Sequence, residues 1–386
     1  MKILFAIPGF GALFGGPTNQ VFHILNLLSE MQYELALITC DYKLDNFYIP
    51  RLNKKIKLEV LKNKFGSYRY LPDLREALNI YKDYDIIHLH SYWSYMNIVC
   101  HRFCLENRLP YILSAYYTTP IILRNYLTKS VFNMFWGNKI INDADYIIAL
   151  SSDEEILYNK RGIDKKKIAR IPVAVQTVSH IGKENIFRET LGLKQREKLI
   201  LFLSRINKKK GLDWFIPVFS KVKDRVPGTK LAIVGSDDGY LACVKKVVEK
   251  LCLKKDVFLL GPVFGDEKWD IYSSADIFVL PSISDAVPAA ALEASIAGLP
   301  LIITRTCGIP EVTTYNAGFE IDYGDSNALG NALIALLKDD TLRKKCGENA
   351  KRMVLDNFTW DKVIKMYEEI YEKAFVSKYL NRGNGY

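Results

Sequence analysis

The sequence lacks the features that mark membrane-spanning, secreted and repetitive proteins. In its 386 residues no stretch approaches about 18 uncharged apolar residues, which predicts that no helix crosses a membrane. The opening MKILFAIPGF has one lysine and a short apolar run without a cleavage site, so we expect a first strand rather than a signal peptide. No segment of solenoid length repeats, which excludes a repeat architecture.

Cysteine is scarce, with seven residues dispersed along the chain. An odd, dispersed set indicates reduced thiols and a cytoplasmic protein rather than a disulfide framework. Cys100 and Cys104 flank His101, a grouping that metal sites use. Because they are one helical turn apart within an apolar run, we expect them to pack in the core.

Basic residues exceed acidic ones by 53 to 43, which gives a net charge of +10. That excess favours an acidic partner: nucleotide phosphates, an anionic membrane surface or nucleic acid. Basic runs occur at 52–65, 165–167 and 208–210. They lack the interleaved aromatic residues of single-strand binders, so we expect no nucleic-acid partner.

Apolar, β-rich runs alternate with helix-like segments, and the alternation starts twice. This pattern predicts an α/β protein with parallel sheets and crossover helices. We expect two doubly wound, Rossmann-like domains facing each other across a cleft. The first covers 1–178 and is completed by a C-terminal helix at about 365–386, and the second covers 179–364. The expected strands are KILFAIPGF, YELALITCD, YDIIHLHS, PYILSAY and ADYIIALS, then KLILFLSRI, TKLAIVGS, VFLLGPV, ADIFVLPS and PLIITRT.

Two strand-to-helix loops carry residues suited to phosphate. Gly15 and Gly16 follow the first strand, where glycine admits a ligand close to the backbone and a helix N-terminus attracts anions. A full G-x-G-x-x-G fingerprint is absent, so a simple turn remains an alternative. In SRINKKKG, Arg205 and Lys210 form a suitable pair for a diphosphate, with a solvated charge run as the alternative.

The stretch PSISDAVPAAALEASIAGLPLI, residues 281–302, contains two acids eight residues apart. We place the start of a helix near Pro288, a residue favoured at the first helical position. The small side chains of Ala289 and Ala290 expose amide groups to an anion. Glu293 in that helix is placed to accept hydrogen bonds from ribose hydroxyls, and Asp285 lies nearer a sugar on the far phosphate.

These motifs, in this order from 199 to 312, resemble the C-terminal half of the family-4 retaining glycosyltransferases, which have GT-B architecture. The glycine loop and IIHLHS extend the resemblance more weakly over nearly the whole chain. In that family an arginine and a lysine neutralise the departing diphosphate, roles that fall on Arg205 and Lys210. The two acids of an E-x7-E motif contact the donor sugar and the ribose, which implies Asp285 and Glu293.

The chain departs from the family pattern at two places. Asp285 is one methylene shorter than the usual glutamate, which withdraws its charge by about a bond length. The family also often has a histidine after the strand that corresponds to PYILSAY, where this chain has Tyr116 and Tyr117. The second difference concerns contacts on the acceptor side.

His88 and His90 lie on the strand IIHLHS. We expect them to face opposite sides of the sheet, with His90, nearer the carboxyl end, as the candidate catalytic residue. A structural histidine at a domain edge is the alternative.

Two D-x-D sequences, at Asp83–Asp85 and Asp143–Asp145, match a metal motif of the other large glycosyltransferase fold. Both stand at expected coil-to-strand boundaries, which explains them without a ligand. We therefore expect no cofactor and no essential metal, with basic side chains and the helix dipole acting on the diphosphate.

The resemblance implies a hexosyltransferase that uses a UDP- or GDP-sugar and a glycan or lipid-linked acceptor, in synthesis of cell-surface polysaccharide or glycolipid. We expect it in the cytoplasm, with contact at the inner membrane face left open. The aromatic and basic segment 116–139 is either a docking surface for a lipid-linked acceptor or core and lid of the acceptor domain. A phosphorylase, a nucleotide-sugar hydrolase and a non-catalytic basic binding protein remain alternatives.

Overall fold

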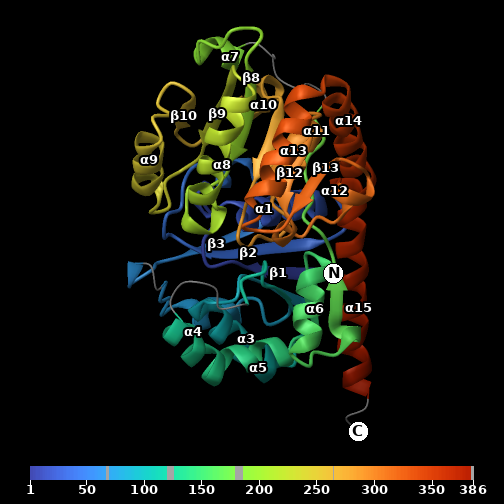
Figure 1. Cartoon of the computed structure of the whole chain (residues 1–386). Helices are drawn as coiled ribbons and strands as arrows, with labels where there is room; N and C mark the ends of the chain where they lie inside the picture. The colour runs from blue at the N-terminus through green and yellow to red at the C-terminus, as the bar shows by residue number, and fades with distance from the viewer. Residues whose placement is uncertain (67–68, 120–125, 179–185, 264, 384–386) are drawn as a thin grey trace. The chain divides into compact units, whose positions relative to one another are not determined.

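The computed structural model of the chain describes residues 1–66, 69–119, 126–178, 186–263 and 265–383, and these form two compact units (Figure 1). Unit 1 comprises Met1–Val173 and Asp361–Tyr386, and unit 2 comprises Ala174–Trp360. The sequence analysis puts its boundaries after 178 and 364. Residues 179–185, next to the first of these boundaries, lie outside the described residues.

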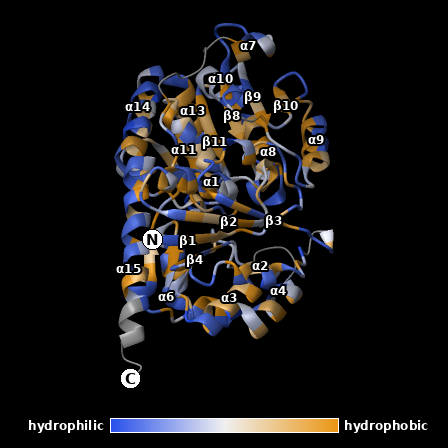
Figure 2. Ribbon diagram, turned by 180° about the vertical axis from the view of Figure 1, so that it is seen from behind, coloured by the Kyte–Doolittle hydropathy of each residue, from blue (hydrophilic) through white to orange (hydrophobic). Residues whose placement is uncertain are grey.

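Unit 1 is built on a seven-stranded sheet with the strand order β3-β2-β1-β4-β5-β6-β7. The register pairs are all parallel, and the order changes direction between β1 and β4. Central strands such as β1 and β4 are almost wholly buried, which matches their hydrophobic colouring in Figure 2. The strands are β1 (Lys2–Ala6), β2 (Glu34–Cys40), β3 (Lys57–Leu61), β4 (Ile86–His90), β5 (Tyr111–Ser114), β6 (Tyr146–Ala149) and β7 (Ile168–Arg170).

Helices cover the sheet of unit 1, and the last of them comes from the end of the chain. In α15, the Tyr371 hydroxyl lies 2.8 Å from His88 Nδ1, and Lys378 Nζ lies 2.9 Å from the Asp85 carboxylate. The helices are α1 (Gly16–Ser29), α2 (Leu74–Asn79), α3 (Tyr95–Asn107), α4 (Tyr126–Phe132), α5 (Asn138–Asn142), α6 (Ser152–Lys160) and α15 (Trp360–Gly383), with short turns η1 (Ala12–Phe14), η2 (Ile49–Arg51), the π-helical η4 (Asn133–Gly137) and η5 (Lys165–Lys167).

Unit 2 repeats the plan with six parallel strands in the order β10-β9-β8-β11-β12-β13. The strands are β8 (Lys198–Leu203), β9 (Thr229–Val234), β10 (Val257–Leu260), β11 (Ile277–Leu280), β12 (Leu301–Thr304) and β13 (Gly318–Ile321). The helices are α7 (Ile186–Thr190), α8 (Leu212–Arg225), α9 (Leu241–Lys250), α10 (Glu267–Ser274), α11 (Ala289–Ile296), α12 (Glu311–Thr314), α13 (Ser326–Lys338) and α14 (Asp340–Asn357), with turns η6 (Lys208–Lys210) and η7 (Arg305–Cys307).

The predicted pair of doubly wound parallel sheets is confirmed. Every strand expected from the sequence is present, but β3, β7 and β13 were not expected. All three are sheet edges. An edge strand has only one neighbouring strand and carries polar residues, so it lacks the continuous apolar run that marks an interior strand.

An aspartate immediately before a strand ties that strand to its neighbour at three places. Asp85 accepts the Lys2 amide at 2.9 Å, Asp145 accepts the Tyr111 amide at 2.9 Å, and Asp276 accepts the Leu199 amide at 2.8 Å. The backbone amide of each aspartate in turn donates to the carbonyl oxygen of the residue whose amide its side chain accepts, namely Lys2, Tyr111 and Leu199 respectively. The two D-x-D sequences are thus strand boundaries, as predicted.

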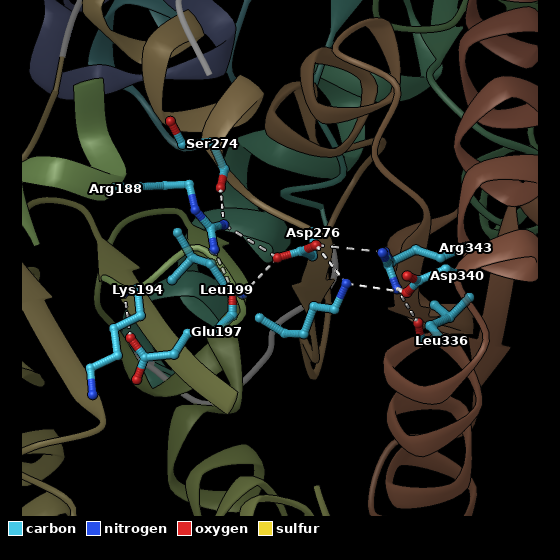
Figure 3. Close-up of polar contacts among 10 residues, drawn as sticks. Arg188, Lys194, Glu197, Leu199, Ser274, Asp276, Leu336, Asp340 and Arg343 are labelled. Atoms are coloured by element: carbon cyan, nitrogen blue, oxygen red, sulfur yellow. Dashed lines mark hydrogen bonds and ion pairs between the residues drawn. The ribbon is translucent and has the colours of Figure 1, made fainter. Parts of the chain in front are cut away.

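Asp276 also gathers basic side chains from three elements of unit 2. In Figure 3 its carboxylate lies between Arg188 and Arg343, at 3.4 and 3.6 Å, and Lys198 Nζ lies at 3.8 Å. Arg343 further donates to the Leu336 carbonyl at 3.1 Å. This network fastens α7 and α14 to the start of β8 and β11.

Among the described residues, no helix is both long enough and apolar enough to cross a bilayer. The cysteines Cys100 and Cys104 are buried on α3, in the core of unit 1, as expected from their spacing.

Candidate functional site

The predicted donor residues of unit 2 lie in two loops that the sheet places next to each other. Strand β8 pairs with β11, and the strand order changes direction between them. The loop after β8 contains Arg205 and Lys210, and the loop after β11 leads through Asp285 to α11. In doubly wound sheets ligands bind at this point, outside the carboxyl ends of the strands.

A close backbone approach joins the two loops. The Ile283 amide donates to the Lys209 carbonyl at 2.7 Å. Gly211 has a φ of +70°, and a Cβ there would overlap the Pro281 carbonyl oxygen. Only glycine accepts both the left-handed conformation and this contact, so Gly211 fixes the loops against each other.

The Asp285 carboxylate is the centre of this junction. One of its oxygens is paired with Lys210 Nζ and accepts the Ser282 hydroxyl at 3.2 Å, while the other accepts the Ala286 amide at 3.1 Å. Both charged side chains are mostly buried, at 11% exposed for Lys210 and 18% for Asp285. The basic loop and the acidic loop are thus in direct contact through the Lys210–Asp285 pair, a contact that was not expected from the sequence.

The loop after β12 supports the acidic loop from the other side. The Asp285 amide donates to the Thr306 carbonyl and the Val287 amide to the Cys307 carbonyl, both at 3.0 Å. These bonds hold Val287 at a φ of +44°, a strained value for a β-branched residue. The hydroxyl of Thr304 also donates to the Ser282 carbonyl, at 2.6 Å.

Three supporting residues, Thr304, Thr306 and Cys307, were not expected from the sequence. They are distant in the chain from the loop that they hold, and no local motif marks them. Cys307 is a structural residue rather than a nucleophile, because burial raises the pKa of its thiol to about 12, with the Asp285 charge adding to the shift.

Helix α11 begins at Ala289, one residue after the predicted start near Pro288. Pro288 is therefore the N-cap residue and not the first helical residue. Pro288 has an extended ψ of 117° and precedes a first turn that includes Ala289 and Ala290, both half-buried. The first amides of a helix have no carbonyl partner within it. Small side chains at this terminus leave the backbone approachable from the Asp285 loop.

Glu293, in the second turn of α11, contacts two residues of α10. Lys268 Nζ lies 2.6 Å from one carboxylate oxygen, and the Tyr272 hydroxyl donates to the other at 3.0 Å. The charged Glu293 side chain and burial together raise the pKa of Tyr272 well above its usual value, with burial as the larger cause. The sequence analysis singled out Glu293 but not Lys268, because no spacing rule links α10 to α11.

Arg205 points to a different acid. Its guanidinium lies 3.0 Å from Asp238, which also accepts the Asn207 amide group at 3.1 Å. The Arg205 side chain is half-exposed. Lys209, between the two predicted basic residues, is half-buried, and burial lowers its pKa against the attraction of Asp285.

In unit 1 the predicted glycines begin α1. Gly15 has a φ of +72° and is the N-cap residue, and Gly16 is the first residue of the helix. A Cβ added to either glycine would meet no atom within 4 Å. The conformation of Gly15 therefore requires glycine, whereas Gly16 keeps space open above the helix terminus.

The prediction that His88 and His90 face opposite sides of the sheet is wrong. Their ring centroids are 4.0 Å apart, because residues two positions apart on a strand share a face. Both rings are fully buried. His90 Nδ1 lies 2.8 Å from the Tyr116 hydroxyl, and its ring stacks on Phe5. Of the described residues, none bonds to His90 Nε2.

The acceptor-side tyrosines both have left-handed backbones, with φ values of +53° for Tyr116 and +54° for Tyr117. The Tyr117 amide donates to the buried Glu154 carboxylate at 2.7 Å. Tyr116 is buried and Tyr117 is half-buried. Tyr116 thus covers His90, and Glu154 fixes the turn that places both tyrosines.

Two family models match the chain and together cover most of it. The model described as Glycosyltransferase Family 4 matches residues 14–178, and the model described as Glycosyl transferases group 1 matches residues 183–353. The matches meet near the junction of the two units.

Two curated relatives match over most of their own length. The N-acetyl-alpha-D-glucosaminyl L-malate synthase of Bacillus anthracis is 26% identical, covering 89% of this chain and 90% of the relative. The UDP-Gal:alpha-D-GlcNAc-diphosphoundecaprenol alpha-1,3-galactosyltransferase of Escherichia coli is 25% identical, covering 95% and 96%. Among solved structures, Anabaena Alr3699/HepE in complex with UDP and glucose has a TM-score of 0.80, 18% identity, and coverage of 97% and 99%. The structural likeness supports the fold alone.

Proposed function

The chain belongs to the family-4 glycosyltransferases, with the GT-B fold, and we propose that it moves a hexosyl group from a nucleotide diphosphate sugar to a hydroxyl. The observation that carries this proposal is the Lys210–Asp285 pair beside the start of α11. It joins a cation, an acid and helix amides at one point of the sheet. A diphosphate with sugars at both ends matches that combination of charges.

The donor would lie along α11. Glu293 accepts hydrogen bonds from the ribose hydroxyls, in place of its present bonds with Lys268 and Tyr272. The amides near Ala289 receive the phosphates, and Asp285 contacts the sugar. The name of the Escherichia coli relative, which contains UDP-Gal, supports a UDP-sugar as one of the donors to test.

In the proposed reaction the bond from sugar C1 to the β-phosphate oxygen breaks, and its electron pair stays on the phosphate. Lys210, Arg205 and the α11 amides stabilise that charge, so the reaction needs no essential metal. The acceptor oxygen bonds to C1 from the same face and its proton passes to a phosphate oxygen. The anomeric configuration is therefore retained, as the family resemblance implies.

For the acceptor we propose a glycan or a lipid-linked sugar, used in synthesis of cell-surface polysaccharide or glycolipid in the cytoplasm, at the inner face of the membrane. The diphosphoundecaprenol acceptor in the name of one relative supports the lipid-linked case. The Tyr116–Tyr117 turn belongs to unit 1, where we place acceptor contacts. The Gly15–Gly16 loop, which we assign to the donor phosphates, is part of the same unit.

Thermal unfolding with a panel of UDP, GDP and ADP sugars tests the donor assignment. We expect one donor to raise the melting temperature of the wild-type protein by several degrees. Glu293→Ala should lose that shift. Glu197→Ala is the matched control, because Glu197 is a similarly shielded acid of unit 2, at 18% exposed against 13%, and it also pairs with a lysine.

Turnover with the identified donor then tests the chemistry. Lys210→Met should lower the rate by roughly 10²- to 10³-fold, as expected when a group that stabilises developing charge is removed. Lys208→Met, an exposed neighbour in the same turn, should leave the rate within about threefold. A protein that no donor stabilises, or whose turnover depends on inorganic phosphate or ignores the acceptor, would contradict the transferase assignment.

A further inference from the structure

An exposed apolar surface lies on the helical segment from Tyr126 to Asn142, which comprises α4, η4 and α5 beside α3 (Figure 1). Soluble monomers seldom concentrate large apolar side chains on one short segment without a binding role. The exposed fractions are 69% for Tyr126, 78% for Leu127, 47% for Val131, 65% for Met134, 54% for Phe135 and 36% for Trp136. These six residues are called the α4 surface below.

The segment is firmly packed on its other side. Phe132 contacts the rings of Tyr92 and Trp93, with centroids 5.8 and 5.4 Å apart. Ile140 and Ile141 are buried in the core of unit 1. The apolar residues of the segment therefore form two sets. One set, which includes Ile140 and Ile141, packs in the core, and the other set, the α4 surface, is exposed. Residues 120–125 lie outside the described residues; they belong to the segment 116–139, which the sequence analysis expects to be either a docking surface or core and lid of the acceptor domain.

The charge around the α4 surface has one sign. From Asn107 to Asn142 the sequence contains four basic residues and no acid. Lys139 is exposed, and Lys129 lies 5.1 Å above the Trp93 ring. The first acid after the segment, Asp143, lies 2.9 Å from His101 Nε2. A helix with apolar residues outward and lysines at its flanks is suited to the interface of an anionic bilayer.

We propose that the α4 surface docks the protein on an anionic lipid bilayer, with the apolar side chains entering the headgroup region and Lys139 contacting lipid phosphates. This inference deepens the proposed function and rests on it for the reason to bind a membrane, because a lipid-linked acceptor resides in such a membrane. The α4 surface belongs to unit 1, which we assign to the acceptor.

A second copy of the chain is a poorer occupant on grounds of charge. A two-fold interface would bring the same segment of both copies together, and this segment contains lysines but no acid to pair with them. A bilayer needs no complementary protein surface, so a small apolar patch with positive flanks is sufficient for reversible binding.

Cosedimentation with vesicles tests the proposal without donor or acceptor. Wild-type protein should bind vesicles made of equal parts phosphatidylglycerol and phosphatidylcholine, and bind pure phosphatidylcholine much less. The double variant Leu127→Ser, Phe135→Ser should bind roughly tenfold or more weakly, because two apolar side chains no longer enter the bilayer. Lys139→Glu should weaken binding only to the vesicles that contain phosphatidylglycerol.

The matched control is the double variant Ile80→Ser, Leu105→Ser, which removes two apolar side chains of the same unit that are 71% and 54% exposed. It should bind as the wild type does, and circular dichroism should confirm that both double variants are folded. Equal binding by all the proteins, or no binding by any, would overturn the proposal. So would a dimer in sedimentation velocity that the Leu127→Ser, Phe135→Ser variant abolishes. None of these readouts requires glycosyl transfer, so the two proposals fail separately.

Discussion

At the scale of single residues, both acids of the candidate donor site are already paired with lysines of the protein. Asp285 contacts Lys210, and Glu293 contacts Lys268. A nucleotide sugar must therefore exchange or share these cations rather than enter a site lined with unpaired charge. Lys210 is well placed to share its charge, since its ammonium group has three donors and can contact a phosphate while it stays beside the Asp285 carboxylate.

The buried histidines of β4 lead to a prediction about pH. Burial lowers the pKa of His88 to about 3 and that of His90 well below its usual value, where the neighbouring His88 adds to the effect. The unfolded chain takes up these protons near pH 6.5, but the folded protein does not. Stability is therefore present above about pH 6.5 and is lost as the pH falls towards 3. From pH 7.5 to 5.5 the loss is about 1.4 kcal/mol per histidine.

The variant His90→Phe isolates this effect. It keeps a ring against Phe5 but cannot take up a proton, so between pH 7.5 and 5.5 it should lose about 1.4 kcal/mol less stability than the wild type. Urea unfolding at several pH values measures the difference. The buried Glu154, whose pKa burial raises, changes stability in the opposite direction and is common to both proteins. Equal slopes for the two proteins would show that His90 is protonated in the folded state.

At the scale of elements, the aspartate before each of three strands links that strand to its neighbour, because its side chain accepts a backbone amide of the neighbouring strand. Asp276 is the most connected of them, because it accepts the Leu199 amide and lies within 4 Å of Arg188, Lys198 and Arg343. Through these basic side chains, helices α7 and α14 contact the beginning of the interior strands β8 and β11. One carboxylate thereby couples four elements of unit 2.

Removing that carboxylate should destabilise unit 2. Asp276→Ala leaves a strand amide and several basic groups without their acceptor, which should cost about 3 kcal/mol of unfolding free energy. Asp276→Asn retains an acceptor for the Leu199 amide and should cost roughly half as much. Asp322→Ala, at a carboxylate that is 78% exposed, is the control and should change stability by less than about 0.5 kcal/mol. Urea denaturation gives all three values, and equal midpoints for Asp276→Ala and the control would contradict the role assigned to Asp276.

How well the sequence predicted each element depended on where the element lies in its sheet. Interior strands such as β4 are buried at every residue, so their apolar runs were readable. Most residues of the edge strand β3 are exposed, and in the sequence they form part of a basic run. Its pairing with β2 decides that it is a strand, and a pairing between distant segments leaves no local pattern.

The candidate site was predicted to a similar extent. Arg205, Lys210 and Asp285 stood out because each follows an apolar strand and precedes a helix, and Glu293 because it lies eight residues after Asp285 within the helix that follows. Lys268, which pairs with Glu293, and Thr304, which bonds to Ser282 in the Asp285 loop, did not, because they come from α10 and β12, which no local pattern links to the site. The positive φ of Val287 was also unreadable, since hydrogen bonds to the next loop impose a conformation that valine disfavours on its own.

At the scale of the whole molecule, unit 2 is an insertion between two parts of unit 1. The chain enters and leaves unit 2 at neighbouring positions: the Val175 amide donates to the Phe358 carbonyl at 2.9 Å, and Val175 forms a parallel bridge with Thr359. The ends of unit 2 are thus joined to each other by the backbone. A unit with its own sheet and core whose ends meet is expected to fold when excised.

The fragment 174–360 should therefore unfold cooperatively and keep the donor-dependent thermal shift of the full chain, because every residue assigned to the donor except Gly15 and Gly16 lies within it. A chain that ends at residue 360 should behave differently: it loses the bonds that α15 makes to His88 and Asp85, so unit 1 should melt first while unit 2 persists. Differential scanning calorimetry of the two proteins, with and without the donor, distinguishes the transitions. A fragment 174–360 that folds but shows no donor shift would place essential donor contacts in unit 1, and a fragment that does not fold would mean that unit 2 depends on unit 1 for its stability.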